Sequence, residues 1–300
     1  MMKILTKYLV LSILCFTSSL TSGSPTIIHI KPRLTDKDHR QVFVHEVIKA
    51  VLDETIKTDG PYKLAAATNM NVDRAEKLRS RYPNLVVRLS GNIQREEHWH
   101  MIPIPINKGI VGYRIFLIRK DDQPKFSKIS TLQDLIASGL IAGQGRTWDD
   151  VAILRKSKLE TVDGGQYNGL FRMLMLGRFD YFPRGINEAF EEVEARRDDF
   201  PGLAVEQNLV IYYPLPRVLA TFKGNHKLAS RIERGLEAIF DNGVHEKIWL
   251  KHHKKWLDMA NLRQRTIIAI KNPFALSNLP YNEDKYWHYP KQKLPPTDQD

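Results

Sequence analysis

Between residues 167 and 196, apolar positions recur at helical spacing on both sides of a short β-prone run. The first helical face consists of Leu170, Phe171, Leu174 and Met175. Gly177 stands where a left-handed residue ends a helix without steric cost. Phe179–Phe182 predicts a strand, which we expect to stop at Pro183 because proline has no N–H to donate. A second amphipathic helix follows, with Ile186, Phe190 and Val193. The segment therefore predicts a helix–strand–helix unit with a polar loop at the carboxyl end of its strand, where open α/β sheets bind ligands.

Strands and helices alternate along most of the remaining chain. The expected strands are 26–30, 62–67, 85–89, 112–119, 140–142, 205–212 and 217–222. The expected helices are 41–55, 72–82, 129–137, 148–156, 228–240 and 244–260. This alternation predicts an α/β fold with largely parallel sheets. The last thirty residues are rich in proline, and we expect them to lie as a strap across the body.

The amino-terminal pattern predicts a cleavable secretory signal at residues 1–23. Lys3 and Lys7 precede an apolar run, 8–16, that is too short to span a bilayer, and small polar residues follow it. An uncleaved membrane anchor is the alternative. We expect export to the periplasm.

The net charge and the cysteine content limit the kinds of partner and of chemistry that we expect. The net charge is +11, and removal of Lys3 and Lys7 leaves +9 because residues 1–23 contain no acid. A basic protein favours anionic partners, and export makes nucleic acid an unexpected one. The only cysteine, Cys15, lies in the expected signal, so the mature chain has no disulfide, thiolate metal site or cysteine nucleophile.

Five segments in order resemble type 2 periplasmic solute-binding proteins of the family 3 extracellular, ABC-transporter type. They are the signal, SGNIQREE, GYRIFLIRK, STLQDLIASGLIAGQGRTWDD and NHKLASRIERGLEAIFDNGVHEKIW. The resemblance spans nearly all the mature chain and implies two lobes, each a mainly parallel sheet flanked by helices, joined by a double-crossover hinge. We expect lobe I at 24–119 and 214–300, and lobe II at 120–213. The lobes of such a protein close on a ligand by rotating about the hinge.

The same resemblance implies ligand contacts. An early arginine in the strand leading to the hinge grips a ligand carboxylate in the family, and Arg114 matches it. A guanidinium pairs bidentately with carboxylate or phosphate, although an arginine in a strand is also a common partner in a structural ion pair. Ser90 and Asn92 match the small polar loop that contacts ligand. Arg40 is a weaker candidate because it also suits the start of the following helix.

A second group of candidates lies in lobe II. Arg146, Thr147 and Trp148 stand where a helix begins, and free N–H groups make that end a natural cradle for an anion. Trp148 either stacks on a planar ligand or covers the hinge. Arg184 is a second cation aimed at the cleft, or a solvated loop residue. The family's aspartate that holds a ligand ammonium has no counterpart in this loop, so an α-amino acid ligand is in doubt.

Catalytic and metal signals are weak. His98 and His100 lie near acidic residues but lack a third ligand at helical spacing, so we expect no metal and no cofactor. No nucleophile-elbow, phosphate-loop or zinc-protease motif occurs, and Asp149 and Asp150 diverge if both lie on a helix. We therefore expect a monomeric, non-catalytic protein that binds a small anionic solute and delivers it to a membrane permease. The alternatives are a ligand-sensing or docking protein for a membrane signalling partner, and a small enzyme such as a dehydratase.

Overall fold

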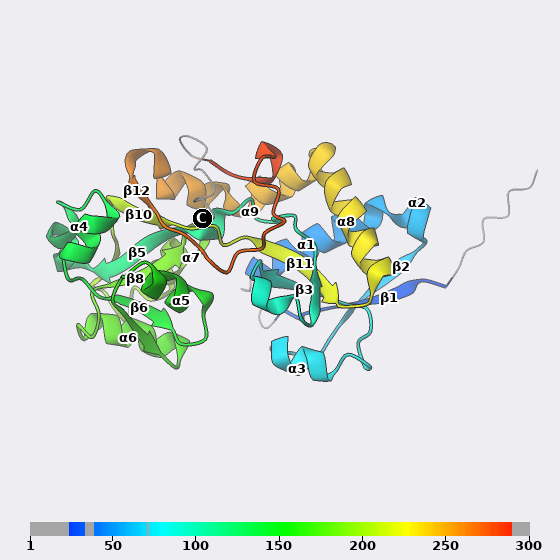
Figure 1. The fold of residues 1–300 in the computed structure, drawn as a ribbon, viewed down its shortest axis with the longest axis horizontal. Coiled ribbons are helices and arrows are strands. Elements are labelled where there is room, and N and C mark those ends of the chain that lie inside the picture. Colours follow the sequence, from blue (N-terminus) through cyan, green and yellow to red (C-terminus); the bar gives the residue numbers. More distant parts are fainter. Residues whose placement is uncertain (1–23, 34–38, 71, 290–300) are drawn as a thin grey trace, which may run out of the picture.

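The computed structural model describes residues 24–33, 39–70 and 72–289, and shows two lobes side by side (Figure 1). The expected signal peptide, 1–23, lies outside the described residues. Each lobe contains one mixed sheet with helices packed on it, so the predicted α/β class is confirmed. The prediction of mainly parallel sheets is wrong, because parallel and antiparallel pairings of the described strands are equally frequent in both sheets.

Lobe I is built on a sheet of strand order β2-β1-β3-β11-β4. Its strands are β1 (Thr26–Ile30), β2 (Tyr62–Ala66), β3 (Leu85–Ser90), β4 (Trp99–Met101) and β11 (Arg217–Phe222). Its helices are α1 (His39–Glu54), α2 (Ile56–Asp59), α3 (Val72–Lys77) and α8 (His226–Asp241). β11 runs antiparallel to both of its neighbours, β3 and β4.

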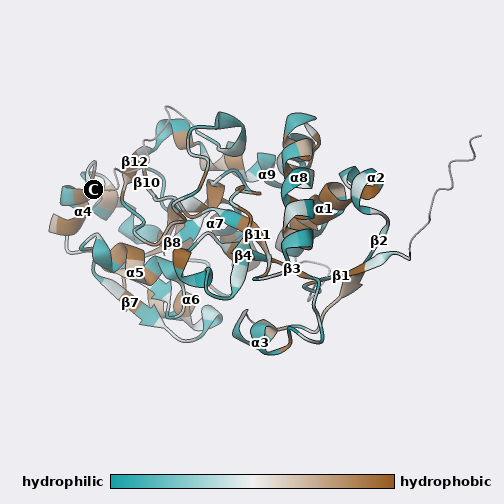
Figure 2. Ribbon diagram, turned by 45° about the vertical axis from the view of Figure 1, so that its right-hand side comes forward, coloured by the Kyte–Doolittle hydropathy of each residue, from teal (hydrophilic) through white to brown (hydrophobic). Residues whose placement is uncertain are grey.

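The helices of lobe I bury the apolar stripes that their sequences present. α8 buries Leu228, Ile232, Leu236 and Ile239, and Figure 2 shows hydrophilic residues on its opposite side. α1 and α8 approach closely at Gly235, where a Cβ atom would lie 2.4 Å from the carbonyl oxygen of Val51. A larger residue at Gly235 would push the two helices apart.

Lobe II is built on a sheet of strand order β12-β10-β5-β8-β6-β7, with β9 also paired to β5. Its strands are β5 (Tyr113–Arg119), β6 (Ala142–Gly145), β7 (Thr161–Gly164), β8 (Tyr181–Gly185), β9 (Leu203–Val205), β10 (Leu209–Tyr212) and β12 (Thr266–Ala269). Its helices are α4 (Leu132–Ala137), α5 (Asp149–Lys156), α6 (Tyr167–Met175) and α7 (Ile186–Ala195). Short 3₁₀ turns lie at Ile93–Arg95, Ile110–Gly112, Lys120–Phe126, Leu262–Gln264 and Asp284–Tyr286.

The expected lobe boundaries are wrong for β5 and β12, which the prediction placed in lobe I. β5 pairs with β8 from Arg114 to Ile118, and β12 pairs with β10, so both belong to the second sheet. The chain crosses between lobes before β5 rather than after Arg119, whose side chain donates to the carbonyl oxygens of Leu174 and Phe179 inside lobe II. A buried strand satisfies its backbone groups in the sheet that it enters, and apolar patterning does not specify which sheet that is.

The prediction that the strand stops at Pro183 is also wrong, because β8 continues to Gly185. Pro183 stands opposite Phe116 in the ladder with β5, and its carbonyl oxygen accepts a 3.0 Å hydrogen bond from the Gln144 side chain. Its backbone therefore faces β6, with which β8 pairs only at Tyr181. The missing N–H costs no ladder bond there. The expected strand 205–212 is likewise two strands, β9 and β10.

Two features hold the lobes together in addition to the crossings before β5 and β11. Helix α9 (Val244–Ala260) packs against α1 of lobe I and α7 of lobe II. After β12 the chain then returns to lobe I as an extended segment, residues 270–289, here called the strap (Figure 1). Within it Asn272 donates to the carbonyl oxygen of Pro214, and the carbonyl oxygen of Phe274 accepts from the Ile93 N–H. The predicted strap is present as far as the described residues reach.

Candidate functional site

A cleft of about 360 Å³ lies between the two lobes. Lobe I and the crossing before β5 contribute Arg88, Ser90, Arg95, Val111 and Arg217. Lobe II contributes Arg114, Thr147, Trp148, Asp149, Asp150, Tyr167, Arg184, Asn187 and Glu188. The predicted candidates Ser90, Arg114, Thr147, Trp148 and Arg184 therefore do meet in one place, although they come from four separate strands and loops. The side chain of Arg40 lies outside the described residues.

Arg114 is held by carboxylates of its own chain. Its side chain is 2% exposed; it pairs with Asp150 and lies 3.6 Å from Glu188. Its Nε donates to the Tyr213 hydroxyl at 3.1 Å, and that hydroxyl donates in turn to Asp150. Burial lowers the pKa of Arg114, but Asp150, Tyr213 and Glu188 together raise the pKa above its ordinary value. These contacts favour the structural ion pair, the alternative that the sequence left open.

Arg184 is also neutralised from within lobe II. Its guanidinium donates to Glu192 at 2.6 and 2.8 Å and lies 3.2 Å from Glu188. It packs over the Trp148 ring at 4.6 Å from the ring centre, a cation–π contact in a largely desolvated place. The Tyr167 hydroxyl completes the group by donating to Glu192 at 2.6 Å. Trp148 and Arg184 thus form one wall of the cleft, with the arginine behind the indole.

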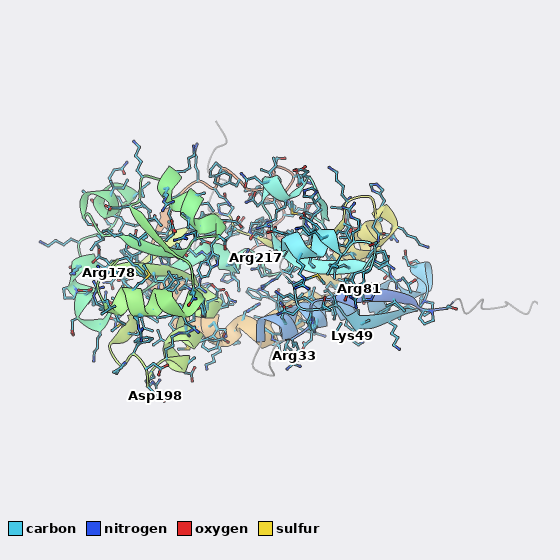
Figure 3. The ribbon with its side chains drawn as sticks, turned by 90° about the horizontal axis from the view of Figure 1, so that it is seen from below. Arg33, Lys49, Arg81, Arg178, Asp198 and Arg217 are labelled. Atoms are coloured by element: carbon cyan, nitrogen blue, oxygen red, sulfur yellow. The ribbon has the colours of Figure 1, made fainter. Side chains whose placement is uncertain are left out.

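Arg217, at the start of β11, is a cation of this cleft that lacks a carboxylate partner among the described residues. Its side chain donates to the Ser90 hydroxyl, and no carboxylate of the described residues forms an ion pair with it. Burial and the neighbouring Arg114 lower the pKa of Arg217, which the more distant Glu188 and Asp150 only partly oppose. Figure 3 shows Arg217 between the lobes, whereas Arg178 and Asp198 lie on the outer side of lobe II.

Sequence reasoning missed both Arg217 and Arg95. The available signal for Arg217 was its position directly after the 213–216 pause, because the first residue of a strand that returns from a crossing faces the space between lobes. Arg95 lies in the same loop as Ser90 and lines the cleft, 3.9 Å from Asp149, and its Nε is buried without a hydrogen-bond partner.

Asn92 acts across the lobes rather than toward an open site. Its side-chain oxygen accepts from the Gln94 N–H at 2.9 Å and so caps a 3₁₀ turn. Its side-chain nitrogen donates at 3.0 Å to Asp149, at the start of α5 in lobe II. The helix start that was expected to cradle an anion carries two acids in its first turn. Asp149 accepts from Asn92 of the opposite lobe, and Asp150 is bonded to Arg114 and Tyr213.

Arg146 lies apart from the main cleft. It is exposed and pairs with Asp163 at 2.8 Å. It lines a more open hollow of about 570 Å³ that adjoins the cleft and shares Thr147, Trp148 and Asp149 with it. All three expected candidates 146–148 line this hollow, and only Thr147 and Trp148 also line the cleft.

No group of three or more histidine or acidic side chains in residues 24–33, 39–70 and 72–289 is arranged to hold a metal ion. Within the same residues no helix combines the length and apolarity needed to cross a bilayer. His98 lies 3.8 Å from Glu76 on the surface of lobe I, away from the cleft.

Comparison with known proteins matches this chain by structure. No family model matches the sequence, and no curated protein matches it. Among solved structures, an ancestral arginine-binding protein bound to glutamine superposes with a TM-score of 0.54, 16% identity and coverage of 77% of this chain and 99% of that chain. A double mutant of the VFT2 domain of Bordetella pertussis BvgS superposes with a TM-score of 0.53 and 16% identity, over 76% of this chain and 92% of that chain. A periplasmic binding protein of Salmonella typhimurium with high arginine specificity superposes with a TM-score of 0.52 and 16% identity, over 77% of this chain and 99% of that chain.

At this level of identity the likeness concerns the fold. The sequence-based resemblance is confirmed in that respect, since the matched structures are two-lobe binding proteins and cover most of the chain. The chain has the two-lobe α/β fold of type 2 periplasmic binding proteins.

Proposed function

We propose that this protein binds a small anionic solute in the cleft between its lobes and delivers it to a membrane permease. The observation that carries the proposal is Arg217, a half-buried guanidinium that lines the cleft without an ion-pair partner among the described residues. A buried charge without a counterion is costly, and an anionic ligand would supply one. Export by the segment 1–23 would place this activity in the periplasm.

The charge of the cleft supports the same conclusion. Five arginines and three carboxylates line it, which gives a formal charge of +2. Counting Glu192, which neutralises Arg184 from behind, leaves +1. The excess lies on the side of lobe I, where Arg95 and Arg217 face lobe II. The positive charge of the cleft would nearly balance the negative charge of a monoanion or a dianion bound there.

Among the similar structures, the ancestral arginine-binding protein is bound to glutamine and the Salmonella protein has high specificity for arginine. A cationic amino acid fits the cleft less well here, because Asp150 is engaged by Arg114 and Tyr213 and Asp149 by Asn92. The same engagement argues for binding rather than catalysis, since an acid–base reaction needs a carboxylate that is available to the substrate.

A sensing or docking role is the second candidate. It is favoured by the contacts that join the lobes through the protein's own groups, the Asn92–Asp149 bond and the strap. The BvgS neighbour is described as a domain, and a lobe pair fixed by such contacts would present one constant surface to a membrane partner. Ligand-dependent closure separates the two roles.

Native mass spectrometry of protein purified from a periplasmic extract would identify a bound solute directly. Thermal shifts should then rank di- and monocarboxylates, phosphate and sulfate above arginine and glutamine. Stabilisation by arginine or glutamine alone would contradict an anionic solute, and a mass without any adduct together with no shift would favour the docking role.

A further inference from the structure

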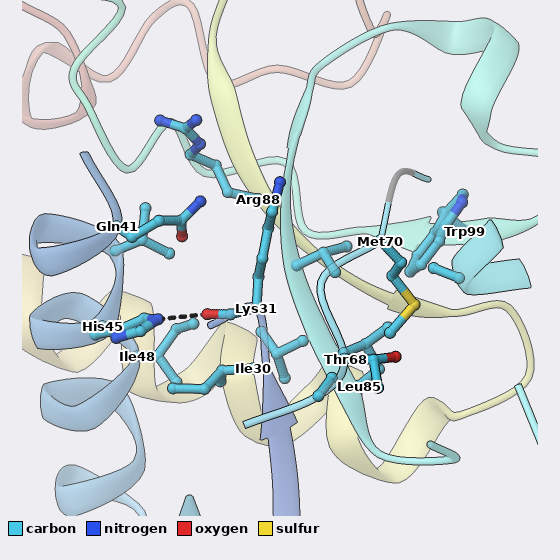
Figure 4. A pocket seen from close by; sticks show the side chains of 15 residues that line it. Ile30, Lys31, Gln41, His45, Ile48, Thr68, Met70, Leu85, Arg88 and Trp99 are labelled. Atoms are coloured by element: carbon cyan, nitrogen blue, oxygen red, sulfur yellow. Dashed lines mark hydrogen bonds between the residues drawn. The ribbon is translucent and has the colours of Figure 1, made fainter. Parts of the chain in front are cut away.

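Lobe I contains a second cavity, of about 280 Å³, next to the cleft (Figure 4). It lies between the inner face of α1, the carboxyl ends of β1 and β2, and the first residues of β3. Its walls are mainly apolar and include Val44, Ile48, Ala67, Leu85 and Trp99. In open α/β sheets this end of the strands is the usual place for a ligand.

The two permanently charged side chains of the cavity lie together at one side. Figure 4 shows Lys31 and Arg88 extending toward the same side, away from Ile30 and Ile48 at the opposite end. His45 also lines the cavity, but its Nε2 is engaged by the carbonyl oxygen of Lys31 at 2.7 Å. The cavity thus has a cationic mouth and an apolar floor.

Arg88 joins this cavity to the cleft, because its side chain lines both. A ligand whose charged end lies among the cleft arginines can therefore extend past Arg88 into the apolar cavity. The floor offers no charged group, so only an uncharged, apolar portion of a ligand fits there without an uncompensated desolvation cost.

We propose that the solute is an amphiphilic anion, a short- or medium-chain carboxylate whose head lies in the arginine-lined cleft and whose hydrocarbon part fills the lobe I cavity. This inference rests on the anion-binding function proposed above. The cavity is slightly below the range of about 300–1,000 Å³ that is usual for whole-ligand sites, which favours a short apolar portion over a long acyl chain.

Isothermal titration with acetate, butyrate, hexanoate and octanoate tests the apolar part, with 1-hexanol as a neutral probe. Affinity should rise about fourfold for each added methylene group, the equivalent of about 0.8 kcal/mol per buried methylene, until the cavity is full. Hexanol should bind more weakly than hexanoate, because it lacks the charge that the arginines recognise.

Ala67→Leu places a larger side chain in the cavity and should flatten the dependence on chain length while acetate binding is kept. Ala66→Leu is the matched control, since Ala66 is the exposed neighbour at the end of β2. If Ala67→Leu does not fold, Val44→Phe fills the cavity from α1 instead.

Each outcome of the series decides the inference. A rise with chain length in the wild type that is lost only in the cavity-filling variants supports it. Equal affinity for all four acids overturns the amphiphilic ligand but leaves anion binding intact. Failure of every anion to bind, with a normal melting temperature, overturns both proposals.

Discussion

Asn92 of lobe I donates a 3.0 Å hydrogen bond to Asp149 of lobe II, and Arg95 lies 3.9 Å from the same carboxylate. One acid at the start of α5 thus links the loop after β3 to the opposite lobe. The contact joins the two lobes through groups of the protein itself.

Removal of this link should open the lobes. We expect Asp149→Ala to increase the radius of gyration of the ligand-free protein in small-angle X-ray scattering, because the hydrogen bond and the nearby charge pair are both lost. The free energy of unfolding should change by no more than about 1–2 kcal/mol, since Asp149 is partly solvated. Asp198→Ala, an exposed acid on the outer side of lobe II, is the control (Figure 3). An unchanged radius would show that α9 and the strap alone hold the lobes.

Arg114 should be needed for stability. Asp150 is 5% exposed, so Arg114→Ala leaves a buried carboxylate without its partner, which typically costs about 3–5 kcal/mol. Urea unfolding monitored by tryptophan fluorescence measures this loss in the absence of solute. Arg178→Ala, an exposed arginine of lobe II, should lose less than about 0.5 kcal/mol. If Arg114→Ala keeps wild-type stability but loses solute affinity, Arg114 is the anchor that the sequence predicted.

Two buried histidines on α9 should make the protein less stable in mild acid. Burial lowers the pKa of His253 to about 3 and that of His245 to about 4, from an ordinary value of 6.5. Below pH 6.5 these histidines bind protons in the unfolded chain but remain neutral in the folded chain. The free energy of unfolding therefore falls as the pH is lowered toward the pKa values of the folded state. Each histidine should lower the free energy of unfolding by up to about 1.4 kcal/mol per pH unit, which amounts to about 2 kcal/mol at pH 5.

Urea unfolding at pH 7 and pH 5 measures this effect. His253→Gln should reduce the difference between the two pH values by about half. His252→Gln, which changes a neighbour on the same helix whose Nε2 lies 3.2 Å from Glu46, is the control. An equal loss of stability in all three proteins would assign the pH dependence to other groups.

The fold was accessible from sequence because its signals are local. The apolar stripe of α8 and the buried run of β5 are each visible within a short stretch of sequence, and so is each of the five family motifs. Together with the order of the motifs, these signals predicted two α/β lobes. The site depends instead on distant pairs. Ser90 and Arg217 are 127 residues apart, and Asn92 and Asp149 are 57 apart. Whether an arginine faces a solute or an internal carboxylate is decided by such pairs, which is why Arg114 was favoured and Arg217 overlooked.

The most direct test of the proposed function is calorimetric titration of the wild-type protein and Arg217→Gln with succinate, phosphate and sulfate. If Arg217 supplies the unpaired charge that recognises the solute, the anion that binds should bind at least about tenfold more weakly to Arg217→Gln, because a hydrogen bond to a charged group contributes about 1.5–3 kcal/mol. Arg178→Gln should match the wild type, and the melting temperature without ligand should not fall. Equal affinity in wild type and Arg217→Gln would contradict anion binding at this cleft.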